Sequence, residues 1–336
     1  MSVGDAEAPQ PGSAANKTPD DAPPLLCLVG PTAAGKTGAA LVLAQAFEGT
    51  VINADSRQVY ADFPIITAQP SAAERAVCPH LLYGFLACHE RVSAGRFTAM
   101  AREAIATCHA QGRLPMLVGG TGLYVRSLLE GLAPIPAIPS EIGRRLAEAC
   151  AARGLEALRQ ELARLDPESA ARLHPNDRQR ILRALEVVEA TGQTLSWWHR
   201  RPVPRPRYRV LKLGLRLDMA VLGPRLARRI ELMLDAGALE EAHQAMAHCP
   251  DPTAPGWSGI GCAELLAHLR GELDLAAATA LWLKNTRAYA KRQMTWFRKE
   301  RDLLWLDASE EATPERLLAL THAFLQGEKL PPSVPA

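Results

Sequence analysis

The sequence predicts an α/β fold in which a parallel sheet is flanked by helices and interrupted by a helical insertion. Short apolar segments alternate with helix-like segments in the first third of the chain, and Gly30–Thr37 reads GPTAAGKT directly after the first of them. From about residue 141 to residue 192 only helical periodicity is present. Alternation of strand, loop and helix is typical of a parallel sheet with helices on both faces.

Each expected strand is a short apolar run bounded by turn residues or by a helical segment. The expected strands are Leu25–Val29, Thr50–Ala54, Leu114–Val118, Val210–Leu217 and Leu303–Asp307, and the expected helices between the first three are Gly38–Phe47 and Phe97–Ala110. In the insertion, the segment HPND (His174–Asp177) supplies a helix N-cap and Gly192 supplies a stop signal.

The chain is therefore expected to comprise one interrupted core and two tails. We predict a disordered tail at 1–24, a catalytic core at 25–140 and 205–310, a helical insertion at 141–204 and a flexible tail at 326–336. The connector His199–Arg209 is rich in arginine and proline. Its basic residues could contact a nucleic-acid backbone or could simply keep a linker solvated.

Composition excludes several classes of protein. The net charge of +2 requires any nucleic-acid surface to be local, and 48% hydrophobic residues predict a packed globule. Seven scattered cysteines without a Cys-x-x-Cys pair argue against a disulfide framework or a cysteine-rich zinc site. With no signal peptide and no apolar run of membrane-spanning length, we expect a cytoplasmic protein that binds no membrane.

The segment Gly30–Thr37 matches G-x-x-x-x-G-K-[ST], which predicts a P-loop NTPase-like core. Glycines permit a tight loop whose amides converge on phosphate oxygens, and the next helix adds its positive end. Lys36 would reach the phosphates and Thr37 would offer a hydroxyl to Mg²⁺. The expected diphosphate-binding residues are Gly30, Pro31, Thr32, Ala33, Ala34, Gly35, Lys36 and Thr37.

The loop alone does not define the reaction. An Asn-Lys-x-Asp guanine reader is absent, and the strand Leu114–Val118 ends in Gly119–Gly122 rather than in an acid that would hold Mg²⁺. Asp55 is the acid that follows a strand in a comparable place. Because strand ends on this side of such sheets face the ligand crevice, Asp55 is a functional candidate, although a turn or helix cap is the alternative.

Five separated stretches resemble one family, the tRNA dimethylallyltransferases. They are GPTAAGKT, NADSRQVY, LPMLVGGTGLYVRSLLEG, HPNDRQRILRALEVVEATG and NTRAYAKRQMTWFRK, and the similarity runs from about Leu25 to Asp307. The resemblance implies a P-loop kinase-like fold with a helical insertion. It also implies that the loop holds the diphosphate of dimethylallyl diphosphate and hydrolyses no nucleotide.

The resemblance implies roles for individual residues. Asp55 would be the general base that accepts the N6 proton of adenine, and Thr121 would fix the amine or a diphosphate oxygen, with a helix cap as its alternative role. Lys36, Mg²⁺ and an arginine would stabilise the leaving diphosphate. That arginine is Arg225 or Arg229, which share a face of the helix expected between Asp218 and Gly237.

The resemblance also implies contacts with an anticodon stem-loop of tRNA, from which the adenine next to the anticodon is extruded. The expected RNA-binding residues are Asp55, Ser56, Arg57, Gln58, Gln179, Arg180, Ile181, Leu182, Arg183, Arg287, Lys291 and Arg292. Their basic members could instead form solvated helix faces. Ser258–Glu264 reads SGIGCAE, in which Cys262 and Ala263 replace an aromatic and a basic residue of many family members.

Two other interpretations stay open at the level of sequence. One is a small-molecule P-loop kinase or an adenylate prenyltransferase, and the other is a non-catalytic P-loop RNA-binding module. The insertion and the basic C-terminal segment disfavour the first, while Lys36, Asp55 and Thr121 together disfavour the second. We expect a monomer, and the absence of a C-terminal Cys/His zinc finger suggests a bacterial type of enzyme.

Overall fold

The computed structural model describes residues 22–203 and 208–332. It divides into two compact units, one of Met1–Leu128 with Arg207–Ala336 and one of Leu129–Pro206. The second unit contains the helices expected at 141–204. Most of the predicted N-terminal tail lies outside the described residues, but Pro24 already belongs to a strand.

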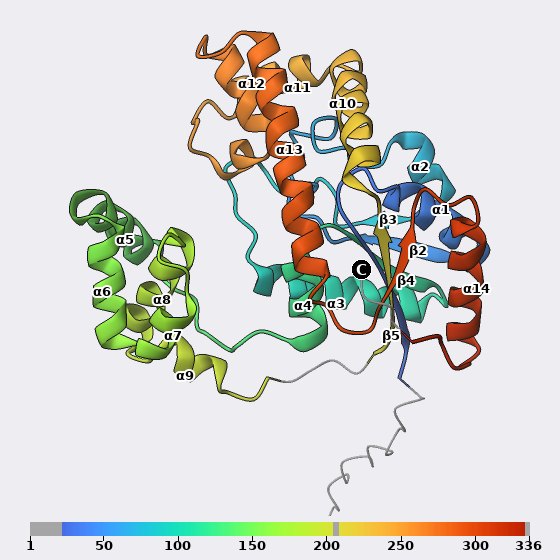
Figure 1. Cartoon of the computed structure of the whole chain (residues 1–336), viewed down its shortest axis with the longest axis horizontal. Coiled ribbons are helices and arrows are strands. Elements are labelled where there is room, and N and C mark those ends of the chain that lie inside the picture. The colour runs from blue at the N-terminus through green and yellow to red at the C-terminus, as the bar shows by residue number, and fades with distance from the viewer. Residues whose placement is uncertain (1–21, 204–207, 333–336) are drawn as a thin grey trace, which may run out of the picture. The chain divides into compact units, whose positions relative to one another are not determined.

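The first unit is built on a parallel six-stranded sheet (Figure 1) in the order β3-β2-β4-β1-β5-β6. The strands are β1 (Pro24–Val29), β2 (Gly49–Asn53), β3 (His80–Leu81), β4 (Leu114–Gly119), β5 (Arg209–Arg216) and β6 (Leu303–Asp307). The central strands are buried on both faces, which explains why they read as continuous apolar runs. All five predicted strands are confirmed, and the sheet is of the predicted class.

Helices cover the sheet and extend beyond it. In the first unit they are α1 (Lys36–Ala46), α2 (Ala72–Val77), α3 (Ala94–Ala110), α4 (Gly122–Glu130), α10 (Met219–Asp235), α11 (Ala238–His248), α12 (Cys262–Leu269), α13 (Leu275–Phe297) and α14 (Thr313–Leu325). The helix α4 crosses the boundary at residue 128. The N-cap of α10 is Asp218, whose side chain accepts a hydrogen bond from the Ala220 amide.

The second unit is a small helical bundle. Its helices are α5 (Ser140–Arg153), α6 (Leu155–Leu165), α7 (Pro167–Arg172), α8 (Arg178–Thr191) and α9 (Leu195–His199). The predicted caps of α8 are confirmed, because the Asp177 side chain accepts from the Arg180 amide and Gly192 adopts a left-handed conformation at the C-terminus. Leu158, Leu162 and Leu185 lie in a core of the unit's own.

Two hydrophobic clusters support the first unit. One surrounds the sheet and includes Leu26, Met116 and Leu213. The other joins α10–α13 to the loop after β2 and includes Phe63 and Trp257, whose rings meet edge to face at 4.9 Å. All seven cysteines are buried free thiols.

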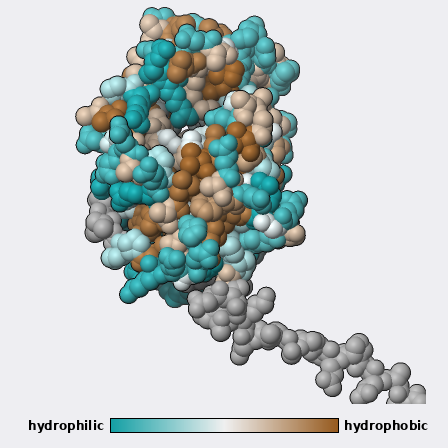
Figure 2. Space-filling view, turned by 90° about the vertical axis from the view of Figure 1, so that its right-hand side faces the viewer, coloured by the Kyte–Doolittle hydropathy of each residue, from teal (hydrophilic) through white to brown (hydrophobic). Residues whose placement is uncertain are grey.

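The surface contrasts with these cores. The face shown in Figure 2 is covered mainly by hydrophilic residues, with a band of hydrophobic residues running between them. Among the residues that the structure describes, none of the helices combines the length and the apolarity needed to cross a bilayer.

Candidate active site

Three loops meet at the carboxyl edge of the sheet. The loop Gly30–Gly35 follows β1, Asp55 follows β2 and the segment Gly119–Gly122 ends β4. Because the sheet order places β2, β4 and β1 side by side, the three loops are neighbours. This edge is where parallel sheets bind ligands.

The first of these loops depends on a glycine. Gly30 has φ +147°, and a Cβ atom there would lie 2.4 Å from the carbonyl oxygen of Leu215 on β5. The backbone therefore turns from β1 into the loop only where no side chain is present. The loop then delivers Lys36 as the first residue of α1, with Gly35 at the N-cap in a left-handed conformation.

A cavity of about 430 Å³ opens where the loops meet. Its lining includes Lys36, Asp55 and both candidate arginines, Arg225 and Arg229. The hydroxyl-bearing Thr37 and the carboxylate-bearing Glu74 line it as well. The sequence predicts that Lys36 and Asp55 share one cavity, and the structure confirms this arrangement.

Lys36 lies beneath its own loop. Its Nζ donates hydrogen bonds to the carbonyl oxygens of Gly30 (3.0 Å) and Pro31 (2.8 Å). Burial lowers the pKa of Lys36, the carboxylate of Asp55 raises it and the positive charge of Arg229 lowers it, and together these effects bring the pKa to about 8. A bound anion would restore the cationic form, so the site is prepared for a negatively charged ligand.

Asp55 is held by its neighbours in a defined orientation. Its amide donates to Asn53 Oδ1 at 2.7 Å, and its Oδ1 accepts from the Arg57 amide at 2.9 Å. In the part of the chain that the structure describes, no group donates a hydrogen bond to Asp55 Oδ2. That oxygen is therefore the one that can accept a proton from a substrate in the cavity.

Thr121 connects two of the loops. Its Oγ1 accepts from the Ser56 amide at 2.9 Å and donates to Ser56 Oγ at 3.3 Å, while its own amide donates to Ala54 O. The hydroxyl thus joins the segment after β4 to the segment after β2. This contact differs from the helix cap that was the alternative role of Thr121.

The two candidate arginines differ in environment. Arg229 is half-buried, and its Nη1 donates to Thr32 Oγ1 at 3.4 Å. Burial lowers the pKa of Arg229, and the carboxylates of Asp55 and Glu74 oppose the shift. Arg225 is exposed and borders both this cavity and a neighbouring one of about 260 Å³.

Two residues of the DSRQ segment are already engaged within the protein. The Gln58 Nε2 donates to the carbonyl oxygens of Thr67 (3.1 Å) and Ala68 (2.6 Å). The Arg57 Nη1 donates to Ser258 Oγ at 2.9 Å. Both side chains therefore shape the loops beside the cavity, and Gln58 also lines it.

The sequence reasoning missed two residues on α13. Gln293 accepts a hydrogen bond from the Thr32 amide at 2.9 Å and donates to Gly120 O at 3.0 Å. Burial raises the pKa of the Tyr289 hydroxyl, Asp55 raises it further, and hydrogen bonding with Thr121 opposes the shift. In the sequence, Tyr289 and Gln293 are four residues apart, which places both on one helix face, and this spacing is the signal that could have identified them.

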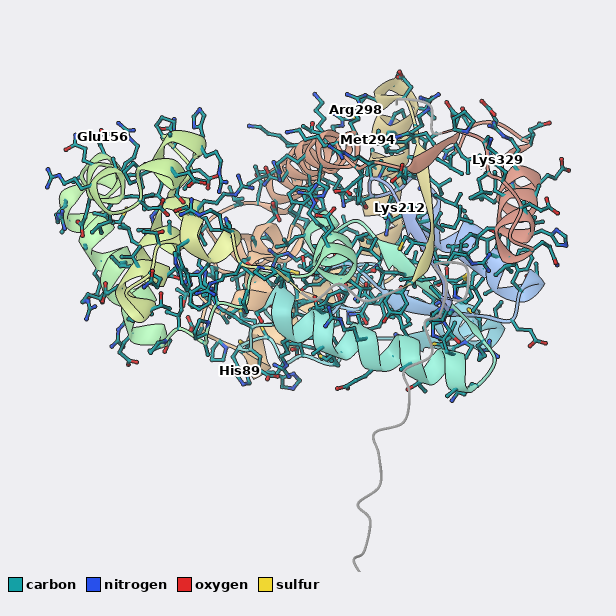
Figure 3. All side chains as sticks on the ribbon, turned by 90° about the horizontal axis from the view of Figure 1, so that it is seen from below. His89, Glu156, Lys212, Met294, Arg298 and Lys329 are labelled. Atoms are coloured by element: carbon teal, nitrogen blue, oxygen red, sulfur yellow. The ribbon has the colours of Figure 1, made fainter. Side chains whose placement is uncertain are left out.

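The outer face of α13 is basic. Arg287, Lys291 and Arg292 are exposed, and the Arg292 guanidinium lies 5.7 Å from the centre of the Tyr289 ring. Met294 and Arg298, labelled in Figure 3, lie at the end of this helix, where Met294 is buried and Arg298 is exposed. The helix therefore has a basic, exposed face and a packed, buried face.

In the helical unit, the predicted RNA-contact residues fall into two groups. Gln179, Arg180 and Arg183 are exposed on α8. Ile181 and Leu182 are buried, at 0% and 6% exposure, in the core of the unit. The helix turns these two side chains toward its packed face, so they do not reach the surface that carries the other three.

The segment Ser258–Glu264 is also largely internal. The buried Glu264 accepts from the Gly261 amide at 2.6 Å and from Asn285 Nδ2 at 2.6 Å. Cys262 is fully buried. The acid that remains from the family pattern therefore fastens the start of α12 to α13.

Comparison with known proteins places this geometry in context. Residues 58–300 match the family model described as IPP transferase. The chain is 59% identical over 295 residues to a tRNA dimethylallyltransferase of Oleidesulfovibrio alaskensis, covering 88% of this chain and 97% of that protein. It is 62% identical over 286 residues to the protein of the same name from Nitratidesulfovibrio vulgaris strain DP4, with 85% and 93% covered.

Solved structures agree. A tRNA isopentenylpyrophosphate transferase from Bacillus halodurans matches with a TM-score of 0.66 at 33% identity, covering 90% of this chain and 96% of that one. A eukaryotic dimethylallyltransferase acting on tRNA matches with a TM-score of 0.77 at 28% identity, covering 92% and 81%. The likeness spans both units of the chain.

Proposed function

The chain belongs to the IPP transferase family, and on that premise we propose that it transfers a dimethylallyl group to tRNA. The donor is dimethylallyl diphosphate and the acceptor is N6 of the adenine adjacent to the anticodon. Diphosphate is the second product. The observation that carries this proposal is that Lys36 and Asp55 line one cavity, a cation for the diphosphate beside a base for the amine.

The chemistry needs both ends of this cavity. The N6 amine of adenine is a weak nucleophile because its lone pair is delocalised into the ring. It attacks C1 of the allylic group while the C1–O bond to diphosphate breaks, and Asp55 Oδ2 accepts the N6 proton. Lys36 and the amino end of α1 stabilise the negative charge that grows on the leaving diphosphate.

The arginines complete the leaving-group side. Arg229 is the closer candidate for the diphosphate, because it is half-buried and already contacts Thr32 of the loop. Arg225 is exposed at the rim of the same cavity, where it can meet the diphosphate as it enters. The Thr121 hydroxyl accepts a hydrogen bond from the Ser56 amide. It thereby holds the segment after β2 against the segment after β4 and so orients Asp55.

Mg²⁺ suits the oxygen donors of this cavity. The Thr37 hydroxyl and the carboxylates of Asp55 and Glu74 line it, although the described residues form no cluster of three or more His, Cys, Asp or Glu side chains able to hold a metal alone. This suits Mg²⁺, which binds through one or two protein oxygens, water and substrate phosphates. When bound, it would neutralise charge on the diphosphate.

The acceptor is expected to meet basic surfaces on both units. Arg287, Lys291 and Arg292 on α13 and Arg180 and Arg183 on α8 are exposed and can neutralise phosphates. The adenine must leave its stack to reach Asp55, so contacts on both sides of it are required. A free nucleotide would have no use for this extent of basic surface.

A transfer assay tests the proposal. The protein is incubated with labelled dimethylallyl diphosphate, Mg²⁺ and an unmodified tRNA, with AMP and ATP as rival acceptors. We expect label in the RNA, at an adenine next to the anticodon, and release of one diphosphate for each group transferred. Label in AMP or ATP but never in RNA would favour an adenylate prenyltransferase. RNA binding without any transfer would favour a non-catalytic module.

A further inference from the structure

We propose that Gln293 is a positioning residue that sets the distance between the diphosphate loop and the loop carrying Thr121, and that this distance controls turnover. The inference rests on the proposed function, because it assigns a role within that same site. It begins from the burial of Gln293, whose side chain is 4% exposed at the inner face of α13. A buried amide is stable only where its donor and acceptor both find partners.

Gln293 finds one partner in each loop. Its Oε1 accepts from the Thr32 amide at 2.9 Å, and its Nε2 donates to Gly120 O at 3.0 Å. Because the Thr32 amide already donates to Gln293, it is not among the loop amides that are free to bind a diphosphate. A single planar group thus spans the gap between the segments that follow β1 and β4, and it does so from a helix that belongs to neither.

The fit leaves no room for another residue at position 120. A Cβ atom there would lie 2.0 Å from Gln293 Nε2 and 3.6 Å from Asp55 Oδ2. The side-chain amide of Gln293 fits here only because residue 120 is a glycine. In turn, that amide fixes the position of the Gly120 carbonyl group, one residue before Thr121. Since Thr121 holds the segment beside Asp55, Gln293 acts through these neighbours on the spacing between base and leaving group.

Such spacing affects chemistry more than binding. A misplacement of about 1 Å in a reacting geometry costs on the order of a hundredfold in rate. We expect Gln293→Met, which keeps the side-chain length but removes both hydrogen bonds, to lower kcat by about that factor. The KM for RNA should change little, because the basic face of α13 is untouched. Gln244→Met, at an exposed position of α11, is the matched control and should behave as wild type.

The variant Gln293→Glu separates hydrogen bonding from packing. An ionised carboxylate can accept from the Thr32 amide but repels Gly120 O, whereas a protonated carboxyl group can satisfy both partners. Burial raises the pKa of a carboxyl group, so the protonated form becomes more populated as the pH is lowered. The ratio of kcat for Gln293→Glu to kcat for wild type should therefore increase as the pH is lowered. A residue that only fills space would give a flat ratio.

A double-mutant cycle with Gly120 covers the case in which Gln293→Met folds poorly. Gly120→Ala should reduce kcat strongly beside Gln293 but add little in a Gln293→Ala background, because the clash and the contact are then both gone. A wild-type kcat in Gln293→Met, a flat pH ratio, or independent effects in the cycle would each overturn the inference. If the wild-type protein itself transfers nothing to RNA, the proposed function has failed instead.

Discussion

At the scale of single residues, the arrangement around Asp55 separates folding from chemistry. We expect Asp55→Asn to preserve the loop, because an asparagine oxygen can still accept from the Arg57 amide. The substitution removes the proton acceptor, so kcat should fall by about 10²–10⁴ while RNA affinity is retained. Single-turnover transfer and equilibrium binding of an anticodon hairpin measure the two effects. A parallel loss of RNA affinity would mean that Asp55 recognises RNA rather than accepting a proton.

Lys36 gives the site a characteristic response to pH. In the free protein its pKa lies at about 8, lowered mainly by burial, and the protonated form binds diphosphate. Raising the pH through this value removes the charge, so kcat/KM for dimethylallyl diphosphate should decline above about pH 8.

The corresponding measurement is kcat/KM for the diphosphate across this pH range, with Lys36→Arg as the comparison. An arginine stays charged throughout, so that variant should show no such decline, whatever its absolute rate. An identical alkaline limb in both proteins would assign the titration to another group.

Residues that carry a motif could be predicted from the sequence, whereas those that act through packing could not. Lys36, Asp55 and Thr121 each follow a recognisable strand, so their meeting at one sheet edge follows from parallel topology. Gln293 and Tyr289 reach the same place from a helix more than 150 residues later. No local pattern distinguishes their inward face from an ordinary packed helix face.

At the scale of elements, α13 presents a packed inner face and a basic outer face. Lys291→Ala or Arg292→Ala should weaken RNA binding similarly across RNA sequences, because phosphates carry no sequence information. Each should also reduce the slope of log K against log salt concentration by about 0.7 to 0.9. Titrations of an anticodon hairpin at several salt concentrations measure both quantities.

Lys329 supplies the control, because it carries the same charge at an exposed position near the C-terminal end of the described chain. Lys329→Ala should leave the salt slope unchanged. An equal reduction in Lys329→Ala would attribute the effect to overall charge rather than to α13.

Helices and strands could be predicted from the sequence where their burial requires a regular pattern of apolar residues. Buried central strands such as β1 and β4 appear as largely apolar runs, and their bounds were predicted to within about one residue. The strand β3 has only two residues and was missed, because it forms through pairing with β2. In α8, five successive residues were expected to contact RNA, but helical periodicity exposes Gln179, Arg180 and Arg183 and buries Ile181 and Leu182.

At the scale of the whole molecule, the two units should respond separately to damage in their cores. Leu158 is fully buried in the helical unit. We expect Leu158→Ala to destabilise that unit by about 2–5 kcal/mol, because it leaves a cavity. Hydrogen exchange should accelerate within residues 129–203 and remain slow in the sheet.

The same variant has a functional readout. Affinity for a diphosphate should persist, since the P-loop and its cavity belong to the other unit. Transfer to tRNA should decline as the α8 surface loses order. Faster exchange throughout β1 and β4 would show instead that the units unfold as one.

The presence of a helical insertion could be predicted from the periodicity of the sequence, but the strand order could not. A switch from alternating strands and helices to helices alone marks the insertion. The order β3-β2-β4-β1-β5-β6 places β1 between a strand that precedes the insertion and one that follows it. Because the apolar runs have similar compositions, the sequence does not show which strands pair with one another in the sheet.

That order has a consequence for synthesis on the ribosome. One side of β1 can pair with β4 early, but its other side waits for β5, whose Arg209 pairs with Pro24 across about 185 residues of chain. At about 5–20 residues per second, translation of that stretch takes roughly 10 to 40 s. For this period a nascent chain displays a bare, apolar strand edge, which is where a cellular chaperone would bind or aggregation would start.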